Sequence, residues 1–335
     1  MVSQLYFRTP GYERLELSTQ VIIAEALKRN IEVEVLDPVD QFIRLRKGKH
    51  IEYIQKATKT SKDSYVVAEI LGNKVVSKRI LKEHGLQVPS GRYYFEKKRA
   101  LEDQRIFRNK EIVMKPKNTN YGIGISILPK KFSSKEFERA VDYAFQFDQT
   151  ILIEQFVAGI ECRFLVIDGR CRAVLNRVPA HVIGDGKHTI QQLISIKNND
   201  PRRGQGHTTP LEFIQLGEVE RQILNEQNLT PKSIPKKGQQ VSLRRNSNIS
   251  TGGDSIDVTD QVHPSYKRIA QKATKAVGAK ICGVDIIAQD FQKKPTSKNY
   301  AILEVNYNPV LYFHNFPYQG KNREVGRYVL DLLEF

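Results

Sequence analysis

Two acids and an amide near the C-terminus have the types and spacing of ligands for a hard metal ion. Glu304 and Asn306 share one face of the apolar run 301–309, because side chains alternate between the two faces of a strand. Asp285, within the apolar run 282–288, can join them from a neighbouring strand. Carboxylate and amide oxygens suit Mg²⁺, which shares its shell with water and phosphate, and Mn²⁺ accepts the same ligands. The sequence therefore predicts a metal site, against the simpler alternative that two acids merely end strands.

A glycine-containing segment, residues 118–125, has the composition of a loop that covers phosphates. Gly122 and Gly124 would let backbone N–H groups approach a phosphate closely. The segment lacks the Gly-Lys-Ser/Thr ending of a Walker A motif, and a plain hairpin turn is the alternative. Lysines that could place a charge on the phosphates occur before it: Lys74, Lys115 and Lys117.

Two further acids follow an apolar strand and are separated by a glycine. Glu154, with the adjoining backbone, could bind the amino edge of adenine, and Glu161 could bind both ribose hydroxyls. Glu161 and Arg163 share a strand face, which leaves Cys162 on the opposite face. We interpret Cys162 as a core thiol rather than a nucleophile.

Residues 243–253, here called the donor loop, are dense in hydrogen-bond donors. The segment contains Arg244 and Asn248, together with hydroxyls and two glycines. Such donors suit a developing oxyanion or a transferred phosphoryl group. A disordered surface loop is the alternative.

The pattern of the chain indicates an α/β scaffold for these residues. Helices are predicted over 17–30, 74–84, 133–147, 264–277 and 324–333, and strands over 31–36, 111–117 and 150–157. Asp168-Gly169 predicts a hairpin within 159–178. The charged stretch 40–64 is predicted to be a linker, and 183–240 a polar insertion. The predicted domains are 1–72, 73–157 and 158–335.

The composition is that of an ordinary globular chain of 335 residues, with 40% hydrophobic and 27% charged side chains. Lys and Arg number 53 against 37 Asp and Glu, and this surplus of +16 favours anionic partners. The basic residues are scattered, so we expect no nucleic-acid partner. Three cysteines without a CxxC pair fit a reducing compartment, and no apolar run reaches membrane-spanning length. We expect a cytoplasmic protein without a membrane partner.

The candidate residues resemble, in order and spacing, those of ATP-grasp carboxylate–amine ligases. The matching set is Lys74, Lys115, 118–125, Glu154, Glu161, Asp285, Glu304 and Asn306. The chain most resembles the ATP-grasp module of bifunctional glutathione synthases, through the blocks 15–20, 57–61, 184–190 and 244–257. The last block is also similar to cyanophycin synthetases.

The resemblance implies an ATP-grasp fold of the α/β (α+β) class, with a small N-terminal domain and two domains that enclose ATP. It implies phosphate contacts from Lys74, Lys115, Lys117, Gly122 and Gly124. It implies adenine contacts from Glu154, Gln155, Phe156 and Val157, ribose contacts from Glu161, and Mg²⁺ ligation by Asp285, Glu304 and Asn306. The catalytic candidates are Arg244 and Asn248, which match the substrate and acyl-phosphate site, and Arg163.

Two features depart from the family pattern. The related D-alanine–D-alanine ligases have an arginine two residues before the metal aspartate, where this chain has Gly283. Stabilisation of an oxyanion would therefore fall to Arg244 or a neighbour. The glutamate–cysteine ligase half is missing, so another protein would supply γ-glutamylcysteine, or the substrate is different.

Our first hypothesis is an ATP- and Mg²⁺-dependent ligase that joins γ-glutamylcysteine to glycine through an acyl phosphate. The nearest alternative is an amino-acid or peptide ligase with another carboxylate and amine. The second alternative is a non-catalytic basic protein that binds nucleotides or nucleic acid. A homodimer is the default expectation for a soluble enzyme.

Overall fold

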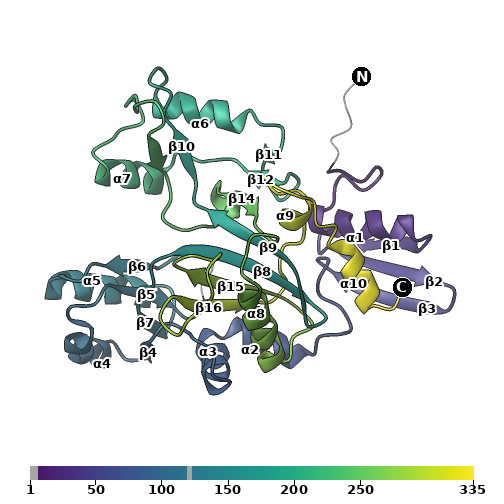
Figure 1. Ribbon diagram of the computed structural model, residues 1–335, viewed down its shortest axis with the longest axis horizontal. Coiled ribbons are helices and arrows are strands. Elements are labelled where there is room, and N and C mark those ends of the chain that lie inside the picture. Colours follow the sequence, from purple (N-terminus) through teal and green to yellow (C-terminus); the bar gives the residue numbers. More distant parts are fainter. Residues whose placement is uncertain (1–6, 119–122) are drawn as a thin grey trace.

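The computed structural model describes residues 7–118 and 123–335, and a five-stranded antiparallel sheet lies at its centre (Figure 1). The strand order is β14-β9-β8-β15-β16. Their bounds are β8 (Ile160–Ile167), β9 (Arg170–Val178), β14 (Asp254–Asp257), β15 (Ile281–Ala288) and β16 (Tyr300–Asn306). β8 and β9 form the predicted hairpin, whose turn residues Asp168 and Gly169 both have positive φ, 51° and 65°.

Helices α2 (Tyr65–Gly72), α3 (Lys74–Glu83) and α8 (Pro264–Val277) cover one face of this sheet. The fully buried Tyr266 of α8 packs in the same core as Phe164 and Val284 of the sheet. α8 begins with Pro264 at its first turn and ends at Gly278, which has φ +75°. Both signals were readable in the sequence, and the predicted bounds of this helix are confirmed.

A second antiparallel sheet, in the order β4-β7-β5-β6, forms the lid beside the central sheet. Its elements are β4 (Gly91–Tyr94), α4 (Lys97–Glu102), η1 (Asp103–Phe107), β5 (Ile112–Pro116), β6 (Ser126–Leu128), α5 (Ser134–Phe145) and β7 (Ile151–Gln155). Ser133 and Glu136 form a capping box that starts α5. The helix buries Phe137 and Val141 against Ile112 and Met114 of β5, and this packing holds the lid together.

The N-terminal region is a three-stranded meander with a helix, and here the predicted linker is wrong. Its elements are α1 (Leu17–Lys28), β1 (Glu32–Asp37), β2 (Phe42–Lys47) and β3 (His50–Gln55). Within 40–64, Ile43, Leu45 and Ile54 are fully buried while the alternating charged side chains stay at the surface. An antiparallel sheet with one wet face needs only half of its residues to be apolar, and the charged half concealed the strands.

The core of the N-terminal region also includes later parts of the chain. Ile22 and Leu45 belong to the same buried cluster as Ile281 of β15 and Val329 of α10 (Gly326–Leu332). The short helix α9 (Tyr312–Asn315) packs beside α1, where Ser18 Oγ accepts a hydrogen bond from the N–H of Leu311, 3.1 Å away. The domain boundaries 1–72, 73–157 and 158–335 stay a proposal.

The insertion, residues 183–240, forms a lobe above the central sheet with a core of its own (Figure 1). The lobe consists of β10 (His181–Ile183), α6 (Ile190–Asn198), β11 (Arg203–Gly204), β12 (Leu211–Glu212), α7 (Glu218–Glu226) and β13 (Gln240–Ser242), and η2 (Ile249–Thr251) follows in the donor loop. Within the described parts of the chain, no helix has the length and apolar character needed to cross a bilayer.

Candidate active site

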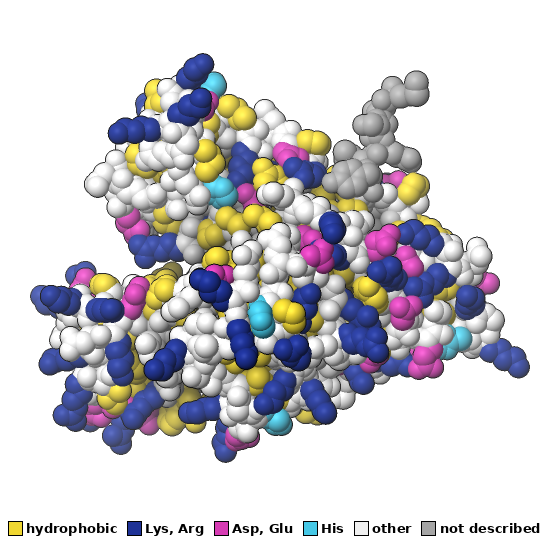
Figure 2. Space-filling model, viewed as in Figure 1, with side chains coloured by type: hydrophobic (Ala, Val, Ile, Leu, Met, Phe, Trp, Pro, Cys, Tyr) yellow, Lys and Arg dark blue, Asp and Glu magenta, His cyan; other side chains and the backbone are white. Residues whose placement is uncertain are grey.

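A cleft of about 1990 Å³ lies where the lid, the central sheet and the insertion meet. Figure 2 shows the groove between the insertion and the lid. Most of the predicted site residues line this cleft: Lys74, Lys115, Glu154, Gln155, Phe156, Val157, Glu161, Arg163, Arg244, Asn248, Asp285, Glu304 and Asn306. Residues from distant parts of the sequence are thus brought to one site.

The three predicted metal ligands lie together on the central sheet. Asp285 and Glu304 are direct partners across the antiparallel pair β15–β16. The Nδ2 atom of Asn306 lies 3.1 Å from Oδ2 of Asp285. The register therefore places two carboxylates and an amide on one patch of the cleft wall, as predicted from the alternation along β16.

Two arginines hold the carboxylate of Asp285. Arg163, its partner across β8–β15, donates from Nη2 to Oδ2 at 2.8 Å and from Nε to Oδ1. Arg177 Nη1 lies 2.9 Å from Oδ2. Burial by itself would raise the pKa of Asp285, but the two guanidinium groups hold it below its ordinary value. Asp285 is therefore a carboxylate at neutral pH.

The predicted metal ligands Asp285, Glu304 and Asn306 offer the oxygen atoms that a divalent cation prefers. Glu304 lies at the cleft wall beside Asp285, and no Lys, Arg or His within residues 7–118 and 123–335 forms an ion pair with it. Two neighbouring carboxylates repel each other unless a positive charge lies between or beside them. Arg163 and Arg177 compensate Asp285. A cation that takes oxygen ligands from Asp285, Glu304 and Asn306 would supply positive charge beside Glu304 as well.

Glu161 is linked both to this acidic pair and to the donor loop. Its Oε1 lies 3.0 Å from Nη1 of Arg177, and its Oε2 accepts a hydrogen bond from Ser247 Oγ at 2.5 Å. Burial raises the pKa of Glu161, although Arg177 opposes that shift. A carboxylate with partners on two sides is held in one orientation, as a ribose contact would require.

A buried acid on the lid is shared by two lysines. Lys115 Nζ lies 2.7 Å from Oε2 of Glu154, and Lys78 forms an ion pair with Oε1. Glu154 is 5% exposed. Burial, together with the neighbouring Lys115, lowers the pKa of Lys78 to about 7. The carboxylate of Glu154 thus orients Lys115, a predicted phosphate contact, together with Lys78, and its contact with adenine stays a prediction.

Lys78 and Arg177 are site residues that the sequence analysis missed. Lys78 lies one helical turn after Lys74 on the same side of α3, so the i, i+4 spacing was a usable signal. Its side chain is buried against Glu154 and does not line the cleft. Arg177 lies on β9, and pairing the hairpin about Asp168-Gly169 would have brought it close to Glu161. Ser247 offered no comparable signal.

Three predicted phosphate contacts are not at the cleft or lie outside the described residues. Lys117 does not line the cleft, and its carbonyl accepts a hydrogen bond of 3.0 Å from Lys74 Nζ. Gly124 has φ +75°, and a Cβ there would lie 2.5 Å from Cγ of Pro116, so this glycine permits close packing. Gly122 falls within 119–122, outside the described residues.

The catalytic candidates of the donor loop face the cleft from the insertion side. Arg244 pairs through Nε with Glu220 of α7, whose side chain is 1% exposed. Asn248 caps η2, because its Oδ1 accepts the N–H of Ser250 at 3.0 Å. Both side chains are therefore fixed by local contacts on the wall opposite the lid.

Comparisons with known proteins identify the family. Residues 13–66 match an ATP-grasp-like domain, and residues 225–316 match a RimK-like ATP-grasp domain. A bifunctional glutathione synthetase from Pasteurella multocida superposes with a TM-score of 0.77, at 42% identity over 98% of this chain and 45% of that one. The chain belongs to the ATP-grasp family.

Curated ATP-grasp relatives agree with this assignment over nearly the whole chain. The glutathione biosynthesis bifunctional protein GshAB of Clostridium perfringens is 51% identical over 98% of this chain, and that of Listeria innocua is 48% identical over the same share. The chain spans 42% of the length of each of these relatives. The predicted fold class is confirmed, as is the resemblance to bifunctional glutathione synthases.

Proposed function

We propose that this ATP-grasp chain is a ligase that uses ATP and a divalent metal ion to join a carboxylate to an amine. One observation carries the proposal. Lys74 of α3 and Lys115 of the lid line the same cleft as Asp285 and Glu304 of the central sheet. Phosphate needs cations on one side, and a phosphate-bound metal needs acids on the other.

The mechanism follows from where the charges lie. The substrate carboxylate attacks the γ-phosphorus of ATP, the bond from that phosphorus to the β-phosphate oxygen breaks, and ADP leaves. Lys74 and Lys115 offset the negative charge that accumulates there. A divalent ion held by Asp285, Glu304 and Asn306 would neutralise phosphate charge on the other side. Glu161 orients the nucleotide through the ribose.

The resulting acyl phosphate then meets the amine. Its carbonyl carbon becomes tetrahedral, and Arg244, held by Glu220, stabilises the oxyanion. The bond from the carbonyl carbon to the phosphate oxygen breaks and phosphate leaves, the nitrogen gives up a proton to solvent, and the amide bond remains. Closure of the lid against the insertion excludes water, which would otherwise hydrolyse the acyl phosphate.

For the substrates we propose γ-glutamylcysteine and glycine, with glutathione as the product. The support is the 51% and 48% identity to proteins named for glutathione biosynthesis. γ-Glutamylcysteine would come from a glutamate–cysteine ligase activity, and the relatives are named bifunctional. We further propose Mg²⁺ as the ion, with Mn²⁺ as a substitute, and a homodimer as the assembly, which light scattering after size exclusion tests.

The deciding experiment combines ATP, Mg²⁺, γ-glutamylcysteine and glycine with the protein and follows ADP release and product mass together. ADP with a product of the mass of glutathione supports both parts of the proposal. ADP only with other amino-acid pairs keeps the ligase chemistry and rejects the glutathione assignment. No ADP with any pair rejects the ligase and favours a protein that binds nucleotides without turnover.

A further inference from the structure

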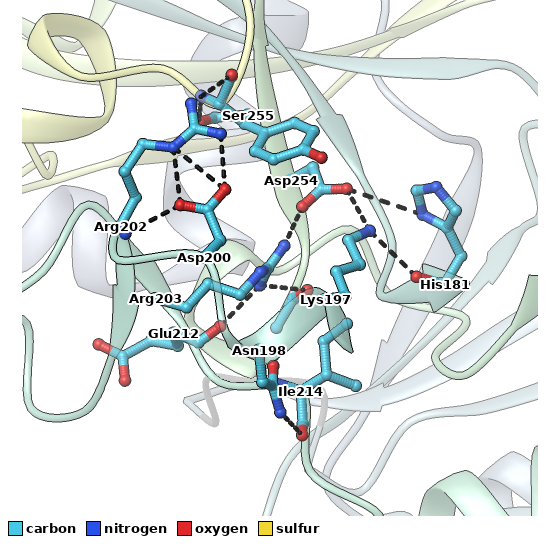
Figure 3. Close-up of polar contacts among 12 residues, drawn as sticks. His181, Lys197, Asn198, Asp200, Arg202, Arg203, Glu212, Ile214, Asp254 and Ser255 are labelled. Carbon is cyan, nitrogen blue, oxygen red and sulfur yellow. Dashed lines mark hydrogen bonds and ion pairs between the residues drawn. The ribbon is translucent and has the colours of Figure 1, made fainter. Parts of the chain in front are cut away.

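Buried charges join the insertion to the residue that directly follows the donor loop. Asp254, the first residue of β14, has a side chain only 4% exposed. Figure 3 shows Arg203 and Lys197, both from the insertion, converging on its carboxylate. Lys197 Nζ lies 2.7 Å from Oδ2 of Asp254 and donates to the carbonyl of His181 at 3.0 Å.

Arg203 holds two chain segments at once. Its side chain is fully buried, and besides its ion pair with Asp254 it donates from Nη1 to the carbonyl of Glu212 at 2.8 Å. The same nitrogen lies 3.3 Å from the carbonyl of Gly252, in the donor loop. The planar guanidinium can bind these three acceptors together, whereas a lysine offers one compact ammonium.

The end of the donor loop is pressed against the segment that Arg203 holds. Gly252 has φ +91°, and a Cβ there would lie 2.8 Å from Cα of Ile214. Asn198 fixes Ile214, because its side chain accepts from the Ile214 N–H at 2.9 Å and donates to the Ile214 carbonyl at 3.0 Å. The loop therefore meets a part of the insertion whose backbone is held by the side chain of Asn198; Figure 3 shows Asn198 and Ile214.

The donor loop is held at a second point, in the cleft, by Glu161 and Arg177. Ser247 Oγ donates to Glu161, and the Ser247 carbonyl accepts from Nε of Arg177 at 3.0 Å. The segment between these two anchors contains Asn248, and Arg244 precedes it. The position of the catalytic candidates thus depends on contacts at both ends, one in the cleft and one buried in the insertion.

We propose that Arg203 is a positioning residue, which fixes the donor loop in its catalytic position through Gly252 and Asp254. This inference rests on the proposed function, because it assigns substrate contacts to the loop. The charge cluster acts through geometry rather than through contact with substrate. It also gives the insertion a role in turnover, in addition to any role in substrate choice.

The test compares Arg203→Lys with Arg323→Lys. Arg323 forms an ion pair with the buried Asp257 at the opposite end of β14, with its own side chain 16% exposed, so its replacement disturbs an arginine–aspartate pair on the same strand without touching the loop. Hydrogen exchange of residues 244–253, measured without ligands, should accelerate by about tenfold or more in Arg203→Lys and stay unchanged in Arg323→Lys. Turnover should fall by about 10²-fold in Arg203→Lys only, with ATP affinity kept.

Unchanged loop exchange and turnover in Arg203→Lys would overturn the inference, as would equal loosening of the loop in Arg323→Lys. If Arg203→Lys does not fold, Asp254→Asn tests the same anchor with the same expected loosening. If the native protein releases no ADP with any substrate pair, the proposed function fails. The hydrogen exchange of residues 244–253 then decides by itself whether Arg203 positions the loop. If the native protein is active but the Arg203 variant is equally active, the inference fails and the proposed function stands.

Discussion

The Nη1 atom of Arg177 lies 2.9 Å from Oδ2 of Asp285. The same nitrogen lies 3.0 Å from Oε1 of Glu161, so one guanidinium compensates an acid proposed for the metal and an acid proposed for the nucleotide. Asp285 is buried in the sheet and Glu161 is partly buried beside the donor loop, where uncompensated charge is costly. The two halves of the proposed site are therefore electrostatically coupled.

Replacing Arg177 by Met should lower the free energy of unfolding by about 3 kcal/mol, because Glu161 loses its guanidinium partner and Asp285 keeps only Arg163. Urea denaturation measures the loss. Mg²⁺ should raise the melting temperature more in this variant than in the native protein, since a cation at Asp285 replaces the lost charge. Arg79→Met, which breaks an exposed ion pair with Glu83, is the control and should change neither quantity. An equal response to Mg²⁺ in the two proteins would argue against metal binding at Asp285.

Glu304→Gln should reduce ADP release by at least about 10²-fold, equivalent to roughly 3 kcal/mol of lost stabilisation of the transition state. The amide keeps the shape of the side chain but removes the charge that a divalent ion requires. Glu32→Gln, on the exposed face of β1, should behave as the native protein. Normal product formation by Glu304→Gln would refute the metal assignment.

Binding of ATP at pH 8 should take up a proton. In the free protein the pKa of Lys78 is lowered to about 7 by burial and by Lys115, so this lysine is mostly neutral at pH 8. Phosphate bound in the cleft beside Lys115 offsets the charge of Lys115, so it raises the pKa of Lys78 and draws a proton from the solution. Calorimetry in buffers of different ionisation enthalpy measures the uptake, which should disappear in Lys78→Met.

The control for the proton uptake is Lys82→Met, an exposed lysine on the same helix.

The lowered pKa of Lys78 also affects how the free energy of unfolding depends on pH. A lysine with a lowered folded pKa binds fewer protons in the folded state than in the unfolded state between pH 7 and its ordinary value of 10.5. Burial of Lys78 therefore lowers the free energy of unfolding at neutral pH, and this loss becomes smaller as the pH rises toward 10.5. Proton release on ATP binding would contradict this account.

Cys162→Ala should keep ADP release within about twofold and lower the free energy of unfolding by about 1 to 2 kcal/mol, as for a small cavity in a packed core. The thiol is 1% exposed, and burial raises its pKa far above the ordinary range. In the native protein it should therefore react with a thiol reagent only after unfolding. Loss of turnover in Cys162→Ala would instead indicate that Cys162 acts as a nucleophile.

Local sequence patterns predicted much of the fold and part of the candidate site. α8 was predictable because Pro264 starts it and Gly278 ends it, and the β8–β9 hairpin because Asp168-Gly169 tolerates positive φ. Glu304 and Asn306 were predictable because alternation within one strand fixes their shared face. Each of these signals lies within a few residues.

The missed contacts depend on pairing between distant elements. Arg177 reaches Asp285 only because β8 lies between β9 and β15, and the register shifts at Leu165. Lys78 reaches Glu154 because α3 packs next to the lid strand β7. The donor loop was recognised by composition, but its anchors at Glu161 and Arg203 come from other elements. Such contacts are set by tertiary packing, which the spacing of residues along the chain does not predict.

The shared core of the N-terminal meander and α10 has a consequence for synthesis on the ribosome. Arg29 of this region pairs with Asp331, which is added 302 residues later. At typical translation rates the partner follows after about 15 to 60 s. Until then the apolar faces of Ile22 and Leu45 lack the side chains of Val329 and Leu330 that cover them in the finished protein. The meander thus keeps an uncovered apolar face until α10 has been made, and a chaperone that bound this face would protect it during that interval.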